Sequence, residues 1–312
     1  MRIDVHAHHY PTEFRETFGR LGRLNAAQNL APGSKITLDE RVDMLKEVGI
    51  DLQVLGVGAN QPYFAKREDA IDGARFANDL YADVCKGYGG RFAAFATVPL
   101  LHVDAAIDEV GRCLETLGML GVGAGTSVAG RPLDDPEFEP FFAELDRRRA
   151  VLFLHPQGIG APMTDAYGLS WMVGGCFEDT VTSLRLIRSG LTTRYPNIKI
   201  IVPHLGGTIP FLMQRVDDSA WREQQRGDQM AIKKPSEALR SLYFDTVNNY
   251  PAALRCSCEA FGADHIMLGT DFPYLFFKPC VEYIQQSGLP AEDIDMILDH
   301  TASRLLGLEA TP

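Results

Sequence analysis

The sequence lacks the features that mark several large classes of protein. None of its apolar runs reaches the roughly 18 residues that a membrane-spanning helix requires, and no signal-peptide pattern precedes the first strand-like run at Arg2. Its six cysteines are scattered and form no paired CxxC motifs, which excludes a disulfide framework of the secreted type. We therefore expect a cytoplasmic protein that does not bind membranes.

An excess of positive charge and nucleotide-binding motifs are also missing. The formal net charge is -11 and the isoelectric point is about 5.2, so the surface repels phosphate backbones and nucleic acid is not an expected partner. A small anionic substrate stays compatible with this charge, because a few arginines inside a pocket can dominate locally. Neither GxGxxG nor GxxxxGK[ST] follows any strand-like run, so the sequence shows no dinucleotide or P-loop site.

What the sequence does contain is an alternation of short apolar runs with longer amphipathic segments. Eight runs are rich in Val, Ile, Leu and Phe, as strands buried on both faces must be. These runs are Arg2–His6, Leu52–Val57, Phe92–Val98, Gly121–Gly125, Val151–His155, Lys199–His204, Tyr243–Val247 and Ile266–Asp271. Helical patterns lie between them, at Leu38–Val48, Asp69–Lys86, Val103–Leu117, Pro136–Arg148 and Thr180–Arg194.

Eight strand-then-helix units predict an α/β protein whose parallel strands close into a (β/α)8 TIM barrel. An open doubly wound sheet is the alternative arrangement of such units. Residues 1–312 show no repeat, no low-complexity segment and no second domain, so we expect one barrel domain. The stretch from Tyr10 to Ile36 is long for a connection, and we assign it to an extended first β-to-α loop on the active-site face.

The first strand-like run ends in VHAHH, which places two histidines at alternate positions. Side chains alternate along a strand, so His6 and His8 should point the same way, into the mouth of the barrel. His9 should point the other way and is not an expected ligand. Two imidazoles aimed at one point suit zinc or a similar divalent ion.

Three more polar residues close apolar runs: His155 in VLFLHPQG, His204 in IIVPHLGG and Asp271 in MLGTDFPY. A barrel places its catalytic groups at these strand ends. Polar groups that converge at one point would each carry a desolvation cost with nothing to offset it. A metal that binds them together offsets this cost. Asp271 would offset the positive charge of the metal, and His155 would complete a set of three nitrogens and one oxygen. His204 could then stay free as a base beside a metal-bound water, whose pKa falls towards ~7.

Three residues have no role that spacing alone can decide. Arg41 lies in the first predicted helix, and Arg215 lies eleven residues after His204. Both would ordinarily be solvated surface charges. Trp171 is one of two tryptophans and lies in the long connection after His155, where it could pack or could form an aromatic wall of the pocket.

Several motifs together resemble the amidohydrolase superfamily. They are VHAHH, FLHPQG, LSWMVGGCFEDT, TTRYPNIKIIVPHLGGTIPFLMQR and MLGTDFPY, which span residues 5 to 274 in order. Within the superfamily, the chain is similar to the branch of aminocarboxymuconate semialdehyde decarboxylase and related aromatic-acid decarboxylases. It departs from the branch near the last helix, where His300 and Thr301 replace the usual Asn-Ala pair.

The resemblance implies a role for each of these residues. It implies His6, His8, His155 and Asp271 as the ligands of one divalent metal, with a water completing the coordination, and His204 as the acid/base. It also implies that Arg41 grips the substrate carboxylate and that Trp171 borders the pocket. Arg215 would reach the neighbouring active site across the interface of a homodimer or a higher homo-oligomer. Zinc suits the ligand set best, and manganese, iron or cobalt would also fit.

These inferences favour a non-oxidative decarboxylase of an aromatic or unsaturated carboxylic acid, in which Asp271 and His204 form the catalytic centre. A hydrolase acting on an amide, ester, lactone or carbon–carbon bond is the alternative, and a hydratase would use the same parts. A barrel that binds a metal and a ligand without turnover is a third possibility. The presence of His204 beside a complete ligand set argues against that third reading.

Overall fold

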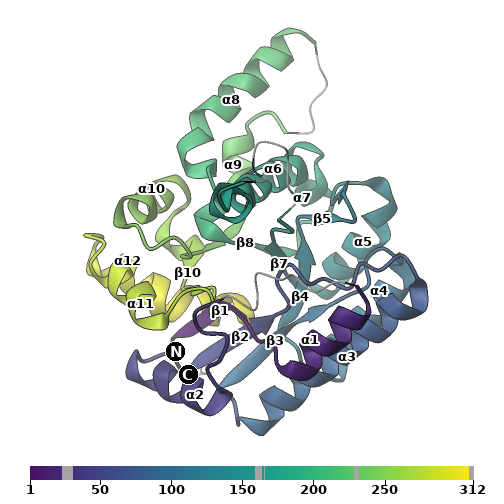
Figure 1. Cartoon of the computed structure of the whole chain (residues 1–312). Helices are drawn as coiled ribbons and strands as arrows, with labels where there is room; N and C mark the ends of the chain where they lie inside the picture. Colours follow the sequence, from purple (N-terminus) through teal and green to yellow (C-terminus); the bar gives the residue numbers. More distant parts are fainter. Residues whose placement is uncertain (23–30, 159–163, 165, 228–231, 309–312) are drawn as a thin grey trace.

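The fold is that of a parallel β-barrel surrounded by helices (Figure 1). The computed structural model describes residues 1–22, 31–158, 164, 166–227 and 232–308. Within these residues one eight-stranded parallel sheet follows the chain in the order β1-β2-β3-β4-β7-β8-β9-β10. Its strands are β1 Ile3–His8, β2 Leu52–Gly56, β3 Phe92–Thr97, β4 Gly121–Gly125, β7 Val151–His155, β8 Lys199–Val202, β9 Tyr243–Asp245 and β10 Ile266–Met267.

Backbone hydrogen bonds between β1 and the segment that continues β10 close the sheet. Val5 N donates to Leu268 O at 3.0 Å, and a parallel bridge joins Ala7 to Phe272. All eight predicted strands are therefore present, and their closure confirms the predicted (β/α)8 barrel over an open sheet.

Helices cover the outside of the barrel and separate consecutive strands. They are α2 Leu38–Glu47, α3 Arg67–Gly87, α4 Val103–Glu115, α5 Glu139–Arg148, α6 Gly175–Arg188, α7 Leu191–Arg194, α8 Ile209–Gln225, α9 Pro235–Leu239, α10 Pro251–Phe261, α11 Phe277–Gln285, α12 Ala291–Asp295 and α13 Thr301–Leu306. The helix α2 begins as its sequence predicts, because Thr37 and Glu40 form a capping box that satisfies its free N–H groups.

The first β-to-α connection is long, as predicted, but it is not only a loop. It contains the helix α1 Thr12–Arg20, whose Phe14 and Phe18 are buried. The part of this connection at residues 23–30 lies outside the described residues. A small antiparallel pair, β5 Ser127–Val128 and β6 Arg131–Pro132, follows β4 and was not predicted.

Two apolar clusters fill the fold. The larger one lies between strands and helices, and a smaller one, including Val5, Val54 and Phe153, fills the barrel. Along β1, Val5 belongs to the inner cluster whereas Ala7 belongs to the outer one, because the register against β2 shifts between Asp4 and Ala7. This irregularity changes the inward and outward alternation just where the histidines of β1 begin.

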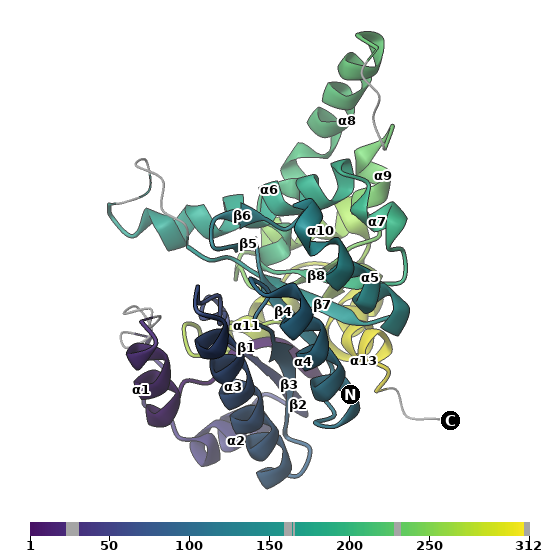
Figure 2. The same ribbon diagram turned by 90° about the vertical axis from the view of Figure 1, so that its right-hand side faces the viewer.

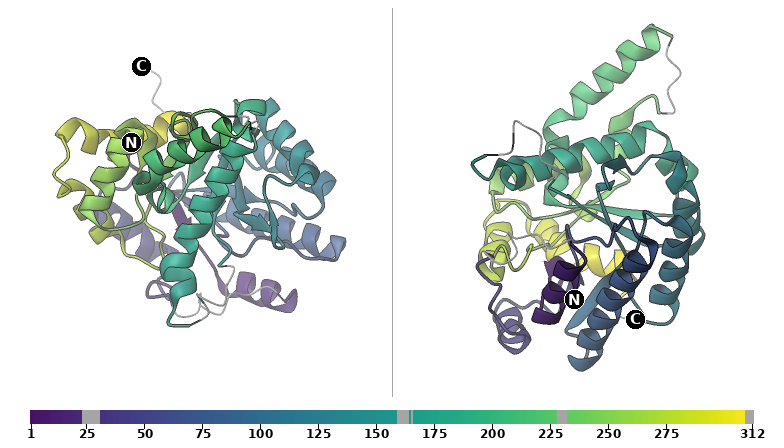
Figure 3. Two further views of the ribbon diagram at one scale, coloured as in Figure 1. Left: turned by 90° about the horizontal axis from the view of Figure 1, so that it is seen from above. Right: turned by 45° about the vertical axis from the view of Figure 1, so that its right-hand side comes forward.

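Helix α8 projects away from the barrel, as Figure 2 and the right-hand view of Figure 3 show. Its side chains Phe211 and Trp221 are 86 % and 60 % exposed. Among the described residues, no helix has the length and apolar character needed to cross a membrane.

Candidate active site

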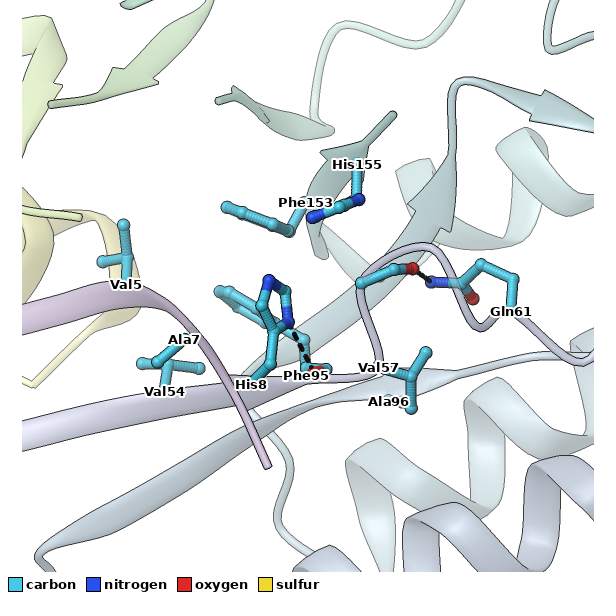
Figure 4. Close-up of a pocket in the computed structure, with 13 residues that line it drawn as sticks. Val5, Ala7, His8, Val54, Val57, Gln61, Phe95, Ala96, Phe153 and His155 are labelled. Atoms are coloured by element: carbon cyan, nitrogen blue, oxygen red, sulfur yellow. Dashed lines mark hydrogen bonds between the residues drawn. The ribbon is translucent and has the colours of Figure 1, made fainter. Parts of the chain in front are cut away.

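Four of the predicted residues meet at the mouth of the barrel. His6 and His8 come from β1, His155 ends β7, and Asp271 lies in the loop after β10. One potential ligand atom from each lies within 4.8 Å of all the others. Figure 4 shows His8 and His155 pointing toward a common space from opposite sides of the barrel. The structure therefore brings together three imidazole nitrogens and one carboxylate.

The far side of each imidazole is held by an oxygen atom. His6 Nδ1 lies 2.6 Å from Asp245 Oδ2, His8 Nδ1 lies 2.9 Å from Gly56 O, and His155 Nδ1 lies 2.8 Å from Pro156 O. Because oxygen accepts in each pair, Nδ1 carries a proton and Nε2 faces the centre, where it can offer its lone pair to a metal. Metal-binding histidines are oriented in this way.

The residues present fit a divalent cation. His6 Nε2 is buried without a hydrogen-bond partner among the described residues, and it lies 3.3 Å from Asp271 Oδ1. The same carboxylate oxygen lies 3.1 Å from His8 Nε2. Three nitrogens and one anionic oxygen at this spacing match the donor set of zinc and related ions.

Charge and burial act in opposite directions on these groups. Burial alone would lower the pKa of His6, but the charges of Asp245 and Asp271 raise it to about 10. Burial lowers the pKa of His8 and holds the pKa of His155 well below its ordinary value. Burial would raise the pKa of Asp271, yet His6 and His8 keep it well below the usual range. Without a metal, the cluster therefore holds its proton on His6.

His204 stands beside this group and is not part of it. Its ring centroid lies 5.5 Å from that of His6, and its Nδ1 lies 2.8 Å from Asp179 Oδ2. Burial would lower the pKa of His204, but the charges of Asp179 and Asp245 raise it. Burial of Asp179 in turn raises the pKa of that carboxyl to about 6. A histidine paired in this way holds a proton on its outer nitrogen and can transfer it.

The backbone around His204 differs from the sequence prediction. Strand β8 ends at Val202, so His204 begins a 3-10 turn, His204–Gly206, and has a φ of 56°. Asp245 Oδ1 accepts from His204 N at 2.8 Å and holds this conformation. Likewise, β10 ends at Met267, and Asp271 lies beyond it with a φ of 55°. Such backbone strain is common at functional sites.

The three predicted substrate residues lie on different elements. Arg41 is 2 % exposed and lies behind β1, where its Nη1 donates to His8 O at 2.8 Å. Arg215 is exposed on α8. Trp171 lies in the π-helix Ser170–Gly174 and is 40 % exposed. Its ring packs so closely on Gly158 that an added Cβ there would lie 2.5 Å from Trp171 Cζ2.

The sequence prediction missed Asp179 and Asp245, which orient His204 and His6. Asp179 occurs within the quoted motif LSWMVGGCFEDT, and Asp245 lies inside the predicted strand Tyr243–Val247, although the observed strand β9 ends at it. A carboxylate within an apolar strand-like run was therefore the available signal for Asp245. Asp179 lies within a helix, and nothing in its local spacing indicates a partner on another unit.

A small cavity adjoins the cluster on the side of β2 and β3 (Figure 4). Its volume is about 10 Å³, enough for roughly one water molecule. Apolar side chains line most of it, and Gln61 contributes an amide whose Nε2 donates to Gly58 O at 3.1 Å. The cavity admits only one small group beside His8 and His155.

Comparisons with known proteins agree on one family. The profile described as Amidohydrolase matches residues 3–308. The 2-amino-3-carboxymuconate-6-semialdehyde decarboxylase of Dictyostelium discoideum is 28 % identical over 98 % of this chain and 89 % of its own length. The gamma-resorcylate decarboxylase of a Rhizobium species is 30 % identical over 87 % of each chain.

A solved structure shares the fold over the same length. The dihydroxybenzoic acid decarboxylase of a Polaromonas species, solved with manganese and the inhibitor 2-nitroresorcinol, superposes with a TM-score of 0.86 at 24 % identity. The superposition covers 99 % of this chain and 98 % of the other. At that level of identity the superposition shows a shared fold and no more.

Proposed function

Since the chain belongs to the amidohydrolase family, in the branch of metal-dependent carboxy-lyases, we propose that it removes the carboxyl group of an aromatic or unsaturated carboxylic acid without oxidation. One observation carries this proposal: the group of His6, His8, His155 and Asp271 adjoins an imidazole, His204, that is paired with a buried carboxylate. Decarboxylation needs a place for the substrate's oxygens and a proton donor beside the carbon that loses carbon dioxide.

His6, His8, His155 and Asp271 would hold one divalent metal. When bound, it supplies positive charge that binds and polarises oxygen atoms of the substrate. We propose zinc as the ion because three imidazoles and a carboxylate suit it best, with manganese as the alternative. The manganese reported for the Polaromonas enzyme supports a divalent ion without selecting between the two.

His204 would deliver the proton. Its Nδ1 is engaged with Asp179, so the transferable proton is on Nε2, which faces away from that carboxylate. The bond between the ring or chain carbon and the carboxyl carbon breaks. Carbon dioxide leaves, and the electron pair of the broken bond stays on the ring or chain carbon. That carbon then takes the Nε2 proton, and the charge of Asp179 stabilises the imidazolium before the transfer.

The substrate carboxylate needs a cationic partner, and Arg215 of a second copy is our candidate. Helix α8 carries this residue on an exposed, projecting segment, which supports a homodimer or higher homo-oligomer. Trp171, beside the loop after β7, would form a wall of the pocket. A cytoplasmic location stays a prediction from the sequence.

Product analysis tests the proposed reaction. Protein reconstituted with zinc or manganese is incubated with a panel of hydroxybenzoic acids in deuterated water and, separately, in water labelled with heavy oxygen. We expect carbon dioxide release, one deuterium at the vacated carbon and no labelled oxygen in the product. Incorporation of labelled oxygen into the product would identify a hydrolase or hydratase and overturn the proposal.

The variant His204→Ala tests the division of roles within the site. It should keep about the same metal content while kcat falls by roughly 10²-fold or more, because only the proton donor is removed. Loss of the metal in this variant would make His204 a ligand, and survival of activity would assign the proton to another group.

A further inference from the structure

A chain of buried polar side chains lies behind β1, between the barrel and α2. The Arg41 guanidinium is 2 % exposed, and its Nε donates to Gln53 Oε1 at 2.5 Å. Gln53 Nε2 donates in turn to Asp4 Oδ2 at 2.5 Å. Asp4 and Gln53 are fully buried, so this chain links a buried cation to a buried anion through one amide.

Both ends of this chain contact the backbone that carries the metal-site residues. Arg41 Nη1 donates to the carbonyl oxygen of His8 at 2.8 Å. Asp4 Oδ1 accepts from His6 N at 3.2 Å and from Thr270 N at 3.0 Å, and Asp4 Oδ2 accepts from Thr270 Oγ1 at 2.6 Å. Thr270 directly precedes Asp271. Three of the four clustered residues are therefore attached to it.

The position of Arg41 is incompatible with direct contact to a substrate in the mouth. Its guanidinium lies over the ring of Phe272, 4.3 Å from the ring centroid. Its Nε and Nη1 donate to Gln53 and to His8 O, and its Nη2 is buried without a hydrogen-bond partner among the described residues. Aromatic faces and buried acceptors stabilise a guanidinium that is out of contact with water. Turning Arg41 to the mouth would leave Asp4 buried without its cationic counterpart.

We infer that Arg41, Gln53 and Asp4 form a clamp that positions His6, His8 and Asp271, and that Arg41 is a positioning residue which does not bind the substrate carboxylate. The clamp supports the spacing between the end of β1 and the strained loop at Asp271, together with the backbone bonds from Asp271 N to His6 O and from His8 N to Phe272 O. Partners that orient metal ligands contribute strongly to affinity, because the free site then needs no rearrangement. This inference rests on the proposed metal site.

Metal affinity tests the clamp without reference to turnover. The affinity of Arg41→Met for zinc is measured by competition with a chromophoric chelator, and the double variant Asp4→Asn/Arg41→Met removes both buried charges in case the single variant does not fold. The zinc affinities of wild-type protein and of His8→Ala give the upper and lower reference values. We expect either Arg41 variant to bind zinc about 10- to 100-fold more weakly than wild type.

Asn78→Ala is the matched control. Asn78 is also fully buried, and it holds the backbone of β3 through Thr97 N and Thr97 O, but β3 carries none of the clustered residues. It should lower the melting temperature and leave zinc affinity within about twofold of wild type, since distant sites act independently.

Kinetics at saturating metal separate the clamp from a substrate-binding role. A clamp variant should then show a KM close to that of wild type, whereas a carboxylate-binding arginine would raise KM and leave zinc affinity unchanged. The second pattern, or equal loss of affinity in Asn78→Ala, would overturn the inference. If wild-type protein binds zinc but decarboxylates nothing, the proposed function fails while the affinity comparison still decides the clamp.

Discussion

At the scale of single residues, the pairing of His204 with Asp179 should set the pH dependence of turnover. The charge and hydrogen bond of Asp179, together with the charge of Asp245, outweigh the effect of burial and raise the pKa of His204, so the imidazole stays protonated to higher pH. A step that needs this proton is fast below that pKa and slows as pH rises through it. In Asp179→Asn the supporting charge is gone, and we expect the falling limb of kcat to move about one unit to lower pH.

The pH profile of kcat measures this shift, and Asp134→Asn is the control. Asp134 pairs with Arg185, which lies on the outer side of α6, the helix that also carries Asp179, and away from His204. Its removal should leave the limb in place. An unchanged limb in Asp179→Asn would mean that another group supplies the proton.

The proton on His6 should make metal binding depend on pH. The pKa of His6 in the metal-free protein is raised to about 10, whereas burial lowers the pKa of His8 and of His155. At neutral pH the cluster therefore holds one proton, which a metal must displace. We expect about one proton to be released for each metal bound, and affinity to rise about tenfold for each pH unit below the pKa of His6.

Calorimetry in buffers with different enthalpies of protonation counts the released protons. In Asp245→Asn the first of the two carboxylates that raise the pKa of His6 is absent and only Asp271 remains, so the count should fall below that of wild type. Equal apparent enthalpies in all buffers for wild-type protein would contradict the assignment of the proton to His6.

At the scale of structural elements, the turn after β2 fixes the ring of His8. Gly58 has a φ of +55°, and a Cβ there would lie 2.8 Å from His8 Cε1 and 2.9 Å from Tyr10 Oη. Gly58→Ala should therefore displace His8 and weaken zinc affinity about 10-fold or more, as loss of a ligand's support does.

Gly89→Ala separates this contact from backbone strain. Gly89 has a φ of +53°, and nothing lies within 4 Å of its added Cβ. Both variants should lose about 1 kcal/mol of stability from the left-handed backbone alone, measured by chemical denaturation. Only Gly58→Ala should also lose metal affinity, and equal affinities in the two would show that His8 tolerates the added methyl group.

The same elements show how far local sequence patterns reach. The apolar runs located every barrel strand, and alternation correctly placed His6 and His8 together, although the register shift in β1 modifies that alternation. Among the strands that the patterns drew too long, β8 was extended to His204 and β10 to Asp271. Both residues adopt positive φ held by tertiary hydrogen bonds, from Asp245 and from the backbone of His6, which local spacing does not encode.

At the scale of the whole molecule, closure of the barrel decides which side chains become neighbours. Parallel strand order follows from eight repeated units, so the convergence of strand-end residues could be predicted. The partners Asp179 and Asp245 could not be ranked, because they depend on how α6 and β9 pack against the loop at His204. The orientation of Arg41 could not be predicted either. The capping box fixes where helix α2 begins, but it does not determine which way a long side chain on that helix turns.

The exposed apolar side chains of the whole molecule predict that it assembles into an oligomer. Helix α8 extends from the barrel with Phe211 86 % exposed and Trp221 60 % exposed, and Phe177 and Val181 of α6 are 52 % and 55 % exposed. Exposed apolar groups of this size mark contact surfaces. If a second copy covers them, Arg215 of one protomer can serve the active site of its partner, so a mixed dimer of Arg215→Ala and His204→Ala chains contains one complete site.

Subunit mixing tests this arrangement directly. Each variant alone should have little activity, and equal mixing after reversible dissociation should restore about a quarter of wild-type activity, since half of the dimers are mixed and each mixed dimer has one intact site of two. If Arg215 served its own chain, every site in the mixture would lack one residue and no activity would return. Sedimentation before and after mixing verifies that the variants assemble as wild type does, so a failure to regain activity would exclude Arg215 as a residue shared between protomers.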